Sequence, residues 1–390
     1  MTDAPDVVLI DGARTPHGTL LGSLAYETAV DLGATAIDGL LDRTILDPDR
    51  VDWVAMGNAI QAGVGQVPAR QATVNAELPN DTAATTVNEA SGSGVRAIAL
   101  AADRITAGRA EFAIAGGMES MSNAPYLLPE FRQGRRHGDG AVVDSMIRDG
   151  LWDVNADQHM GELTEAMVDR EGIDRRAQDE YALRSHRRAA AAIEAGTFDP
   201  ETVGVETPDG VIDRDEGPRP DSTLESLEAL PPAFGEHGTI TAANASKLAD
   251  GAGCVLVTTV EAAHERDLSI AARLVDYAVA YRDPTEFNEA VVDALRTLLD
   301  RNDLRPEEID HYEVNEAFAA QSVLVRDALD LSMAQFNPNG GAVAFGHPIG
   351  ASGGMLATSL LYAMEREDVT YGVVGMSVGG GGAIMALLER

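Results

Sequence analysis

One histidine of this chain lies in a segment of unusually small residues. His347 stands in the run Gly346-His-Pro-Ile-Gly-Ala-Ser-Gly353, and Pro338 and Pro348 restrict the backbone on either side of it. Small residues leave room for a bulky ligand beside an imidazole and bring backbone N–H groups close to that ligand. The segment therefore predicts a site at which His347 acts on a bound molecule.

A serine in the first half of the chain is a candidate nucleophile. Ser91 lies in the run Asn88-Glu-Ala-Ser-Gly-Ser-Gly94, at the start of a segment over residues 92–107 whose apolar side chains follow helical spacing. A serine hydroxyl needs an adjacent base before it can attack a carbonyl carbon, and His347 is the obvious base. The alternative interpretation is that Ser91 caps the helix, a position that serine often fills.

The elements around these residues indicate a duplicated α/β domain. Short apolar runs alternate with helix-patterned segments, which predicts strand–helix–strand units. The runs 112–117 and 373–378 read as equivalent strands, and the Asn-Glu-Ala sequences at 88–90 and 315–317 each precede a predicted helix. Further helices are expected at 175–195, 288–299 and 320–331.

The middle of the chain has a different composition. Residues 119–248 carry charged loops, and residues 199–232 are dense in Pro, Asp and Glu. Such a stretch is too long for a plain connection, which predicts a functional lid or binding segment. We therefore expect one half to comprise residues 1–118 with 249–268, an inserted loop domain to span 119–248, and a second half to span 269–390.

Composition narrows the possible partners and the possible environment. The 390 residues include 63 acids against 29 bases, a formal charge of −34, and Lys247 is the single lysine. This acidic surface makes nucleic acid an unsuitable partner, and it resembles the haloarchaeal type that stays soluble in concentrated salt. The one cysteine, Cys254, excludes an internal disulfide and fits a reducing cytoplasm. We predict no signal peptide, no membrane span and no metal site.

Eleven short motifs, in order along the whole chain, resemble those of a known enzyme family. The chain resembles the thiolase family, CoA-dependent enzymes that make or split a carbon–carbon bond in 3-ketoacyl-CoA. The resemblance implies a five-layered α/β/α/β/α fold of two similar halves with the inserted loop domain. The motifs are Ala13-Arg-Thr-Pro16, Gly57-Asn58, Gln61-Ala-Gly63, Pro68-Ala-Arg-Gln-Ala72, Gly116-Gly-Met-Glu-Ser-Met-Ser122, His159-Met-Gly161, Asn244-Ala-Ser246, Asp250-Gly-Ala252, Asn315-Glu-Ala-Phe-Ala319, Gly346-His-Pro-Ile-Gly-Ala-Ser-Gly353 and Gly379-Gly-Gly-Gly382.

The chain departs from the family at both reactive cysteines. Ser91 stands where the family has its nucleophile, and Ser377 stands where the family has the cysteine that moves a proton. Ser377 is a poor base; either His347 or His159 replaces it, or it relays a proton through water, or it only packs. Three explanations of Ser91 compete: a natural nucleophile, an engineered Cys→Ser change, and a homologue that binds acyl-CoA without turnover. We favour the natural nucleophile because both positions, rather than one, are serine.

The remaining family positions are present. The resemblance implies that His347, with a water held by Asn315, polarises one thioester oxygen, and that the N–H groups of Ser91 and Gly379 form a second oxyanion hole. It also implies that Ser246 meets the pantetheine of CoA and that Arg219 lies near the nucleotide. The same resemblance implies that His159, Met160 and Phe318 line the tunnel that holds the pantetheine. Lys247 either contacts CoA or faces solvent. Glu119, His17 and His311 receive no predicted role.

The predicted function is therefore acyl transfer between CoA thioesters. An acyl-Ser91 intermediate would join two acetyl-CoA into acetoacetyl-CoA and CoA, or let CoA cleave a 3-ketoacyl-CoA, with no metal or redox cofactor. The alternatives are a hydrolase, in which water accepts the acyl group, and a scaffold that binds acyl-CoA. Relatives are dimers or tetramers, and residues 123–140 match their tetramer contacts, so we expect a homo-oligomer.

Overall fold

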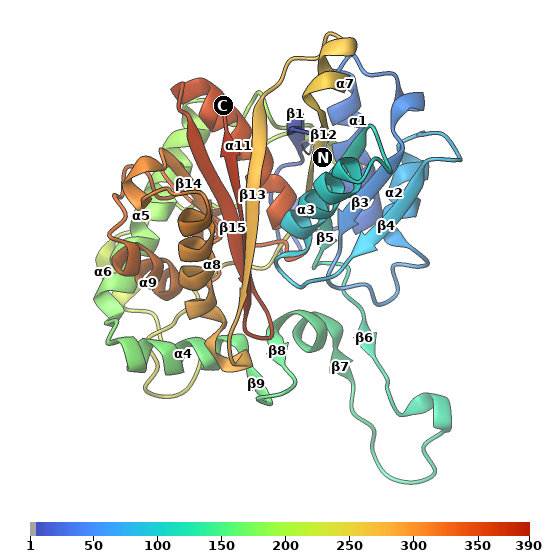
Figure 1. Cartoon of the computed structure of the whole chain (residues 1–390). Helices are drawn as coiled ribbons and strands as arrows, with labels where there is room; N and C mark the ends of the chain where they lie inside the picture. Colours follow the sequence, from blue (N-terminus) through green and yellow to red (C-terminus); the bar gives the residue numbers. More distant parts are fainter. Residues whose placement is uncertain (1–4) are drawn as a thin grey trace.

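A computed structural model of the chain describes residues 5–390, and residues 1–4, at the start of the segment on which the signal-peptide prediction rests, lie outside it. Ten strands of the described residues form one mixed sheet in the order β14-β15-β16-β13-β1-β12-β5-β3-β4, with β2 paired to β12 (Figure 1). The strands of this sheet are β1 (Val7–Arg14), β2 (Gly18–Thr19), β3 (Trp53–Gly57), β4 (Ala83–Val87), β5 (Ala113–Ser120), β12 (Ala249–Thr259), β13 (Ala272–Tyr281), β14 (His311–Val314), β15 (Tyr371–Val378) and β16 (Gly382–Glu389).

Helices cover both faces of each half of this sheet. Helices α1 and α2 pack outside the first half and α8 and α9 outside the second, while α3 and α11 lie between the halves. This order gives the five layers that were predicted, so the predicted α/β fold is confirmed. The helices of these layers are α1 (Ala29–Arg43), α2 (Pro68–Asn75), α3 (Ser93–Thr106), α8 (Phe287–Arg301), α9 (Ala319–Leu329) and α11 (Ser352–Glu367).

The two central helices meet backbone to backbone at their N-terminal ends. A Cβ atom on Gly94 would lie 2.5 Å from the backbone nitrogen of Gly354, and one on Gly353 would lie 2.4 Å from that of Val95. Both distances are far below van der Waals contact, so only glycine permits this approach. Because the turns that precede α3 and α11 carry Ser91 and His347, the close contact brings these two residues together.

The structure contains the predicted duplication, but one of the two pairs of similar sequences was matched wrongly. Strands β5 and β15, predicted as equivalents over 112–117 and 373–378, do occupy equivalent places. However, β14 runs parallel to β15 as β3 runs parallel to β5, so Asn315 after β14 corresponds to Asn58 after β3. Asn88 instead follows the edge strand β4. The prediction that Asn88 and Asn315 are equivalent was therefore wrong. It rested on three identical residues, and the order of the strands in the sheet gives a different correspondence.

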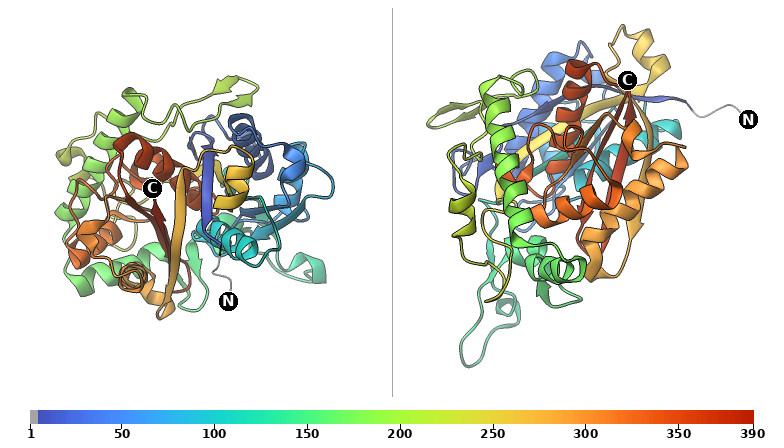
Figure 2. Two further views of the ribbon diagram at one scale, coloured as in Figure 1. Left: turned by 45° about the horizontal axis from the view of Figure 1, so that its top comes forward. Right: turned by 90° about the vertical axis from the view of Figure 1, so that its left-hand side faces the viewer.

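The residues between β5 and β12 form a separate set of helices and loops (Figure 2). The excursion over residues 199–232 folds into a two-stranded hairpin and a short helix, and residues 123–145 extend from the body of the molecule (Figure 1). The domain boundaries stay a prediction. Within residues 5–390, no helix is long and apolar enough to cross a membrane. The elements of this region include α4 (Met160–Glu171), α5 (Arg175–Glu194), β10 (Val205–Thr207), β11 (Gly210–Ile212) and α6 (Leu224–Glu228).

Candidate active site

Ser91 and His347 are in direct contact although 256 positions separate them in the chain. Ser91 Oγ lies 2.8 Å from His347 Nε2, a normal hydrogen-bond distance. Helix α3 is capped by the backbone of Gly92, with no hydrogen bond from a side chain, so Ser91 is not the cap residue. The hydroxyl is directed at the imidazole, which is the arrangement of a nucleophile and its base.

A tight turn between β4 and α3 presents Ser91 to the pocket. Ala90 has a left-handed backbone with φ of 47°, uncommon for a residue with a side chain. The Asn88 side chain holds the turn by accepting from Ala90 N at 3.1 Å and donating to Ala59 O at 3.1 Å. Glu89 pairs with Arg96 one turn into the helix. This ion pair fastens the turn to the first turn of the helix.

The other nitrogen of His347 determines its tautomer. His347 Nδ1 lies 2.6 Å from Ser352 Oγ, and Ser352 donates its hydroxyl proton to Pro348 O at 3.1 Å. Since that proton is committed, Nδ1 carries a hydrogen and donates it to Ser352, which leaves the Nε2 lone pair free. The network therefore leaves Nε2 ready to accept the proton of Ser91.

Burial keeps this imidazole neutral. His347 is 7% exposed, and burial, with a smaller contribution from the nearby His17, lowers its pKa to about 4. A neutral imidazole can accept a proton at neutral pH, whereas an imidazolium cannot. The same low pKa means that the charged form costs free energy once the proton arrives.

A buried carboxylate fixes the loop beneath His347. Glu119, which sequence reasoning gave no role, accepts from the backbone nitrogens of Gly350 at 2.8 Å and Ala59 at 2.9 Å, and from Asn58 Nδ2 at 2.6 Å. Burial raises its pKa to about 7, although the backbone donors lower it. Glu119 thus ties the loop after β3 to the loop that carries His347.

Asn315 is directed at the same point as the reacting pair. Its Nδ2 atom lies 3.4 Å from His347 Nε2, and its backbone is held by Gly375 O and by Gln321 Nε2. An amide donor and an imidazole that converge on one spot can bind an oxygen atom or a water between them. The role predicted for Asn315, to hold a water beside His347, stays a prediction.

A mostly apolar pocket surrounds Ser91 and His347. It brings together eight of the ten predicted site residues, and it has room for a small acyl group. Asn315 contacts it through His347, and Arg219 lies outside it. The side chain of His159 faces the pocket, accepts from Gly161 N at 3.0 Å and stacks on Phe234. The predicted residues in the lining are Ser91, His159, Met160, Ser246, Phe318, His347, Ser377 and Gly379.

A wide groove of about 750 Å³ adjoins this pocket at Ser246, which lines both. Arg219 lies in the groove, and its backbone nitrogen donates to His186 Nδ1 at 3.1 Å. Lys247 donates to Ala344 O at 2.9 Å and to Gly217 O, so it ties the loop at Gly217 to the short helix α10 (Ala342–Phe345). Burial, with the neighbouring Arg219, lowers the pKa of Lys247 to about 8. The groove therefore offers positive charge beside an apolar wall.

Sequence comparison identifies the family. The family model described as "Thiolase, N-terminal domain" matches residues 7–261, and the model described as "Thiolase, C-terminal domain" matches residues 268–390. An acetyl-CoA acetyltransferase of Cupriavidus necator is 44% identical over 390 residues, 99% of each chain, and one of Escherichia coli K12 is 44% identical over 388 residues, 98% of each chain.

Solved structures agree with the sequences. The acetyl-CoA acetyltransferase of Bacillus anthracis superposes with a TM-score of 0.96 at 37% identity over 99% of each chain. Human mitochondrial 3-ketoacyl-CoA thiolase in complex with CoA also gives 0.96, at 35% identity over 99% of this chain and 98% of that one. This chain belongs to the thiolase family, and it is an acyltransferase.

Proposed function

We propose that this protein is a thiolase that transfers acyl groups between CoA thioesters through an ester on Ser91. The observation that carries the proposal is the 2.8 Å contact between Ser91 Oγ and the unprotonated Nε2 of His347, inside a pocket of acyl size. The relatives named above as acetyl-CoA acetyltransferases support acetyl-CoA and acetoacetyl-CoA as substrates. CoA itself is the second substrate of the cleavage reaction.

The groove at Ser246 supplies the CoA-binding site of this proposal. Arg219 recognises a phosphate of the nucleotide, since arginine presents several donors to phosphate oxygens. The pantetheine arm passes Ser246 and runs along Met160 and Phe318 to the thioester. His186 stays neutral beside Arg219, because burial, with the charges of Lys247 and Arg219, lowers its pKa to about 3.

The reaction proceeds in two acyl transfers. His347 takes the Ser91 proton, Ser91 Oγ attacks the thioester or ketone carbon, and the bond to the leaving group breaks. The leaving group departs as the CoA thiolate or as the enolate of acetyl-CoA, and it gains the proton that His347 took up. The N–H groups of Ser91 and Gly379 stabilise the tetrahedral oxyanion, and Asn315 with His347 stabilises the enolate oxygen. The acyl group then passes from Ser91 to CoA or to an enolate.

The α-proton has two candidate acceptors in the pocket. His347 and His159 both line it, and burial lowers the pKa of each. Nδ1 of neutral His159 accepts from Gly161 N, so Nε2 carries its hydrogen, and His159 takes a proton only after that bond opens. Ser377 also lines the pocket and adds a hydroxyl to it. His159→Gln distinguishes the two: loss of hydrogen exchange at the α-carbon of acetyl-CoA assigns the step to His159, and retention assigns it to His347.

The test is turnover of acetoacetyl-CoA with CoA in high salt, in native protein and in Ser91→Ala and Ser91→Cys variants. Turnover that disappears in Ser91→Ala supports the serine thiolase. Activity that appears only in Ser91→Cys would mean a homologue that binds acyl-CoA without turnover. Free acetate in place of acetyl-CoA would identify a hydrolase.

We also propose that the protein is halophilic, cytoplasmic and homo-oligomeric. The extended segment over residues 123–145 exposes apolar side chains, and such side chains on a projecting loop suit a contact with another copy of this chain. Sedimentation of a variant in which Tyr126, Leu128 and Phe131 are changed to Ser should show a smaller assembly; an unchanged mass would contradict this assignment.

A further inference from the structure

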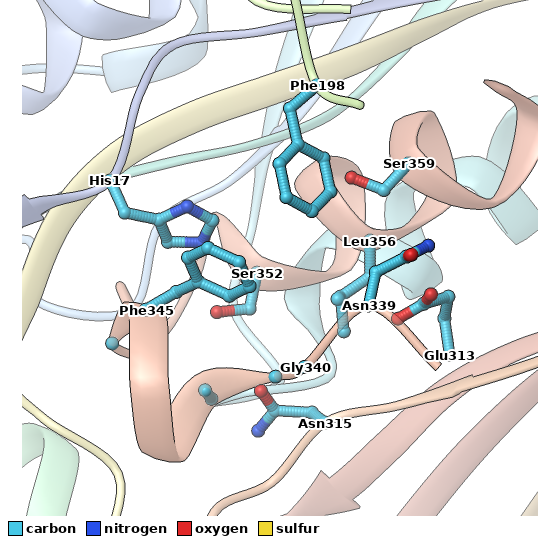
Figure 3. Close-up of a pocket in the computed structure, with 13 residues that line it drawn as sticks. His17, Phe198, Glu313, Asn315, Asn339, Gly340, Phe345, Ser352, Leu356 and Ser359 are labelled. Carbon is cyan, nitrogen blue, oxygen red and sulfur yellow. The ribbon is translucent and has the colours of Figure 1, made fainter. Parts of the chain in front are cut away.

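A second cavity lies on the Nδ1 side of His347. Ser352, the partner of Nδ1, lines it together with Asn315 and Glu313 (Figure 3). Most of its lining is buried, and its volume is about 30 Å³. A buried water needs about 10–15 Å³ on this scale and two to four polar partners, so the cavity has room for roughly two water molecules.

Glu313 connects this cavity with the molecular surface. His311 Nε2 lies 2.7 Å from Glu313 Oε1, and His311 Nδ1 lies 3.2 Å from Glu367 Oε2. His311 and Glu313 are two positions apart in β14, so their side chains lie on the same face of the strand, the face that packs on α11. His311 is fully buried, whereas the Glu367 side chain is 36% exposed. A chain of titratable groups therefore runs from the cavity to solvent.

Two other polar side chains of the lining have partners of their own. His17 Nδ1 lies 3.0 Å from Asp215 Oδ1, and Ser359 Oγ donates to Glu201 at 2.6 Å. Among residues 5–390, the second oxygen of Glu313 has no protein partner at hydrogen-bond distance. His17 Nε2 and the amide oxygens of Asn315 and Asn339 are further acceptors of the lining. Glu313 differs from them because it is an acid that His311 and Glu367 join to the surface, which makes its second oxygen the acceptor that can pass a proton on from a water next to Ser352.

We propose that water in this cavity joins Ser352 to Glu313, so that the catalytic imidazole exchanges protons with the surface through Ser352, Glu313, His311 and Glu367. The proposal rests on the proposed function, because it assigns a route for the proton that His347 takes from Ser91. Ser352 and Glu313 act through His347 and touch no substrate.

The proton transfers balance at every step. Ser91 Oγ–H gives its proton to His347 Nε2, and the Nδ1 proton moves to Ser352 Oγ. The Ser352 hydroxyl, which donates to Pro348 O at rest, turns and gives its own proton to the water, and the water gives one to the carboxylate of Glu313. His347 ends neutral in the other tautomer, and the reverse sequence restores the resting state. The charge that burial disfavours on His347 is thereby moved onto a carboxylate.

The kinetic test compares Glu313→Gln with Glu365→Gln. Glutamine keeps the shape of Glu313 and an acceptor for His311 but cannot take a proton, while Glu365 is an exposed acid on α11 that lies outside the route. For Glu313→Gln we expect kcat to fall about ten- to a hundredfold, KM for CoA to stay constant, and the solvent deuterium isotope effect to shrink. Glu313→Asp should recover part of kcat. Native kcat and isotope effect in Glu313→Gln would overturn the relay.

A second measurement is independent of turnover. A high-resolution crystal structure of the native protein should show ordered water within hydrogen-bond distance of both Ser352 Oγ and Glu313. A dry cavity, or water bonded to only one of the two, would overturn the relay even if the enzyme is active. If the native protein does not turn over acetoacetyl-CoA, the proposed function fails, and the water positions still decide whether the connection exists.

Discussion

Single residues determine whether a hydroxyl can replace a thiol at this site. Ser91 has an unprotonated imidazole nitrogen at 2.8 Å, and Ser352 keeps that nitrogen unprotonated by accepting from Nδ1. A thiolate forms readily near neutral pH, whereas a hydroxyl must lose its proton to a base during attack. The contact with His347 therefore matters more here than it would for a cysteine.

Thiol reagents test this substitution directly. Cys254 is fully buried, and burial raises its pKa far above the usual range, so iodoacetamide should leave native activity unchanged. Ser91→Cys should be inactivated by the same reagent, at a rate that acetyl-CoA slows. The measurement is residual thiolysis after timed incubation. Inactivation of the native protein would contradict the assignment of Ser91.

Sequence reasoning found the reacting residues because each stands in a short, distinctive motif. It gave Glu119 no role because its partners, Asn58 and Gly350, lie 61 and 231 positions away. Ser352 stood inside a predicted motif, yet its bond to Nδ1 depends on the orientation of the ring. The Asn-Glu-Ala echo failed for a related reason, because strand order is a long-range property that local letters do not determine.

At the scale of elements, buried ion pairs hold the inserted region to the central sheet. Arg14 of β1 is fully buried and bonds to Asp215 at 2.9 and 3.0 Å and to Glu201 at 2.6 Å. Both carboxylates belong to the segment between α5 and α6. Sequence reasoning recognised Arg14 only as part of a motif, since its partners lie 187 and 201 positions away.

Arg14→Gln should destabilise the protein strongly. It would leave two buried carboxylates without their cation, and breaking a buried pair in this way costs about 3–5 kcal/mol. Arg305→Gln is the control, because the Arg305 side chain is 68% exposed and solvent screens its pair with Glu308. Chemical unfolding measures both. Equal losses in the two variants would argue against a structural role for the Arg14 pairs.

The connection from β14 to α11 predicts a pH dependence of stability. Burial lowers the pKa of His311, but its bonds to Glu313 and Glu367 and their charges outweigh burial and raise the pKa to about 9. Because the pKa of His311 is higher in the folded protein than in the unfolded chain, protonated His311 stabilises the folded state. This stabilisation is complete at pH values below about 6.5, the pKa in the unfolded chain, and it is lost as the pH rises through 9. The contribution is about 3 kcal/mol at most.

His311→Gln should therefore cost most near pH 6. The difference in free energy of unfolding between native protein and variant should shrink between pH 6.5 and pH 9. Urea unfolding at a series of pH values, at constant salt, measures this difference. A loss that stays constant over that range would show that His311 contributes by packing alone.

At the scale of the whole molecule, charge is the dominant feature. A formal charge of −34 on 390 residues repels itself in the compact state unless salt screens it. The Debye length falls from about 10 Å at 0.1 M salt to about 3 Å at 1 M. We therefore expect Tm to rise by many degrees between 0.1 M and 2 M KCl. Sucrose at equal osmolality is the control, and a Tm independent of KCl would contradict the halophilic assignment.

The most direct test of the central claim is the covalent intermediate itself. Native protein mixed with acetyl-CoA, quenched in acid within a turnover and digested with protease should carry one acetyl group on the peptide that contains Ser91. Ser91→Ala should carry none, and Ser91→Cys should carry the group as a thioester that hydroxylamine removes. An unmodified Ser91 peptide from protein that turns over acetoacetyl-CoA would contradict the account, because the acyl group would then pass through another residue.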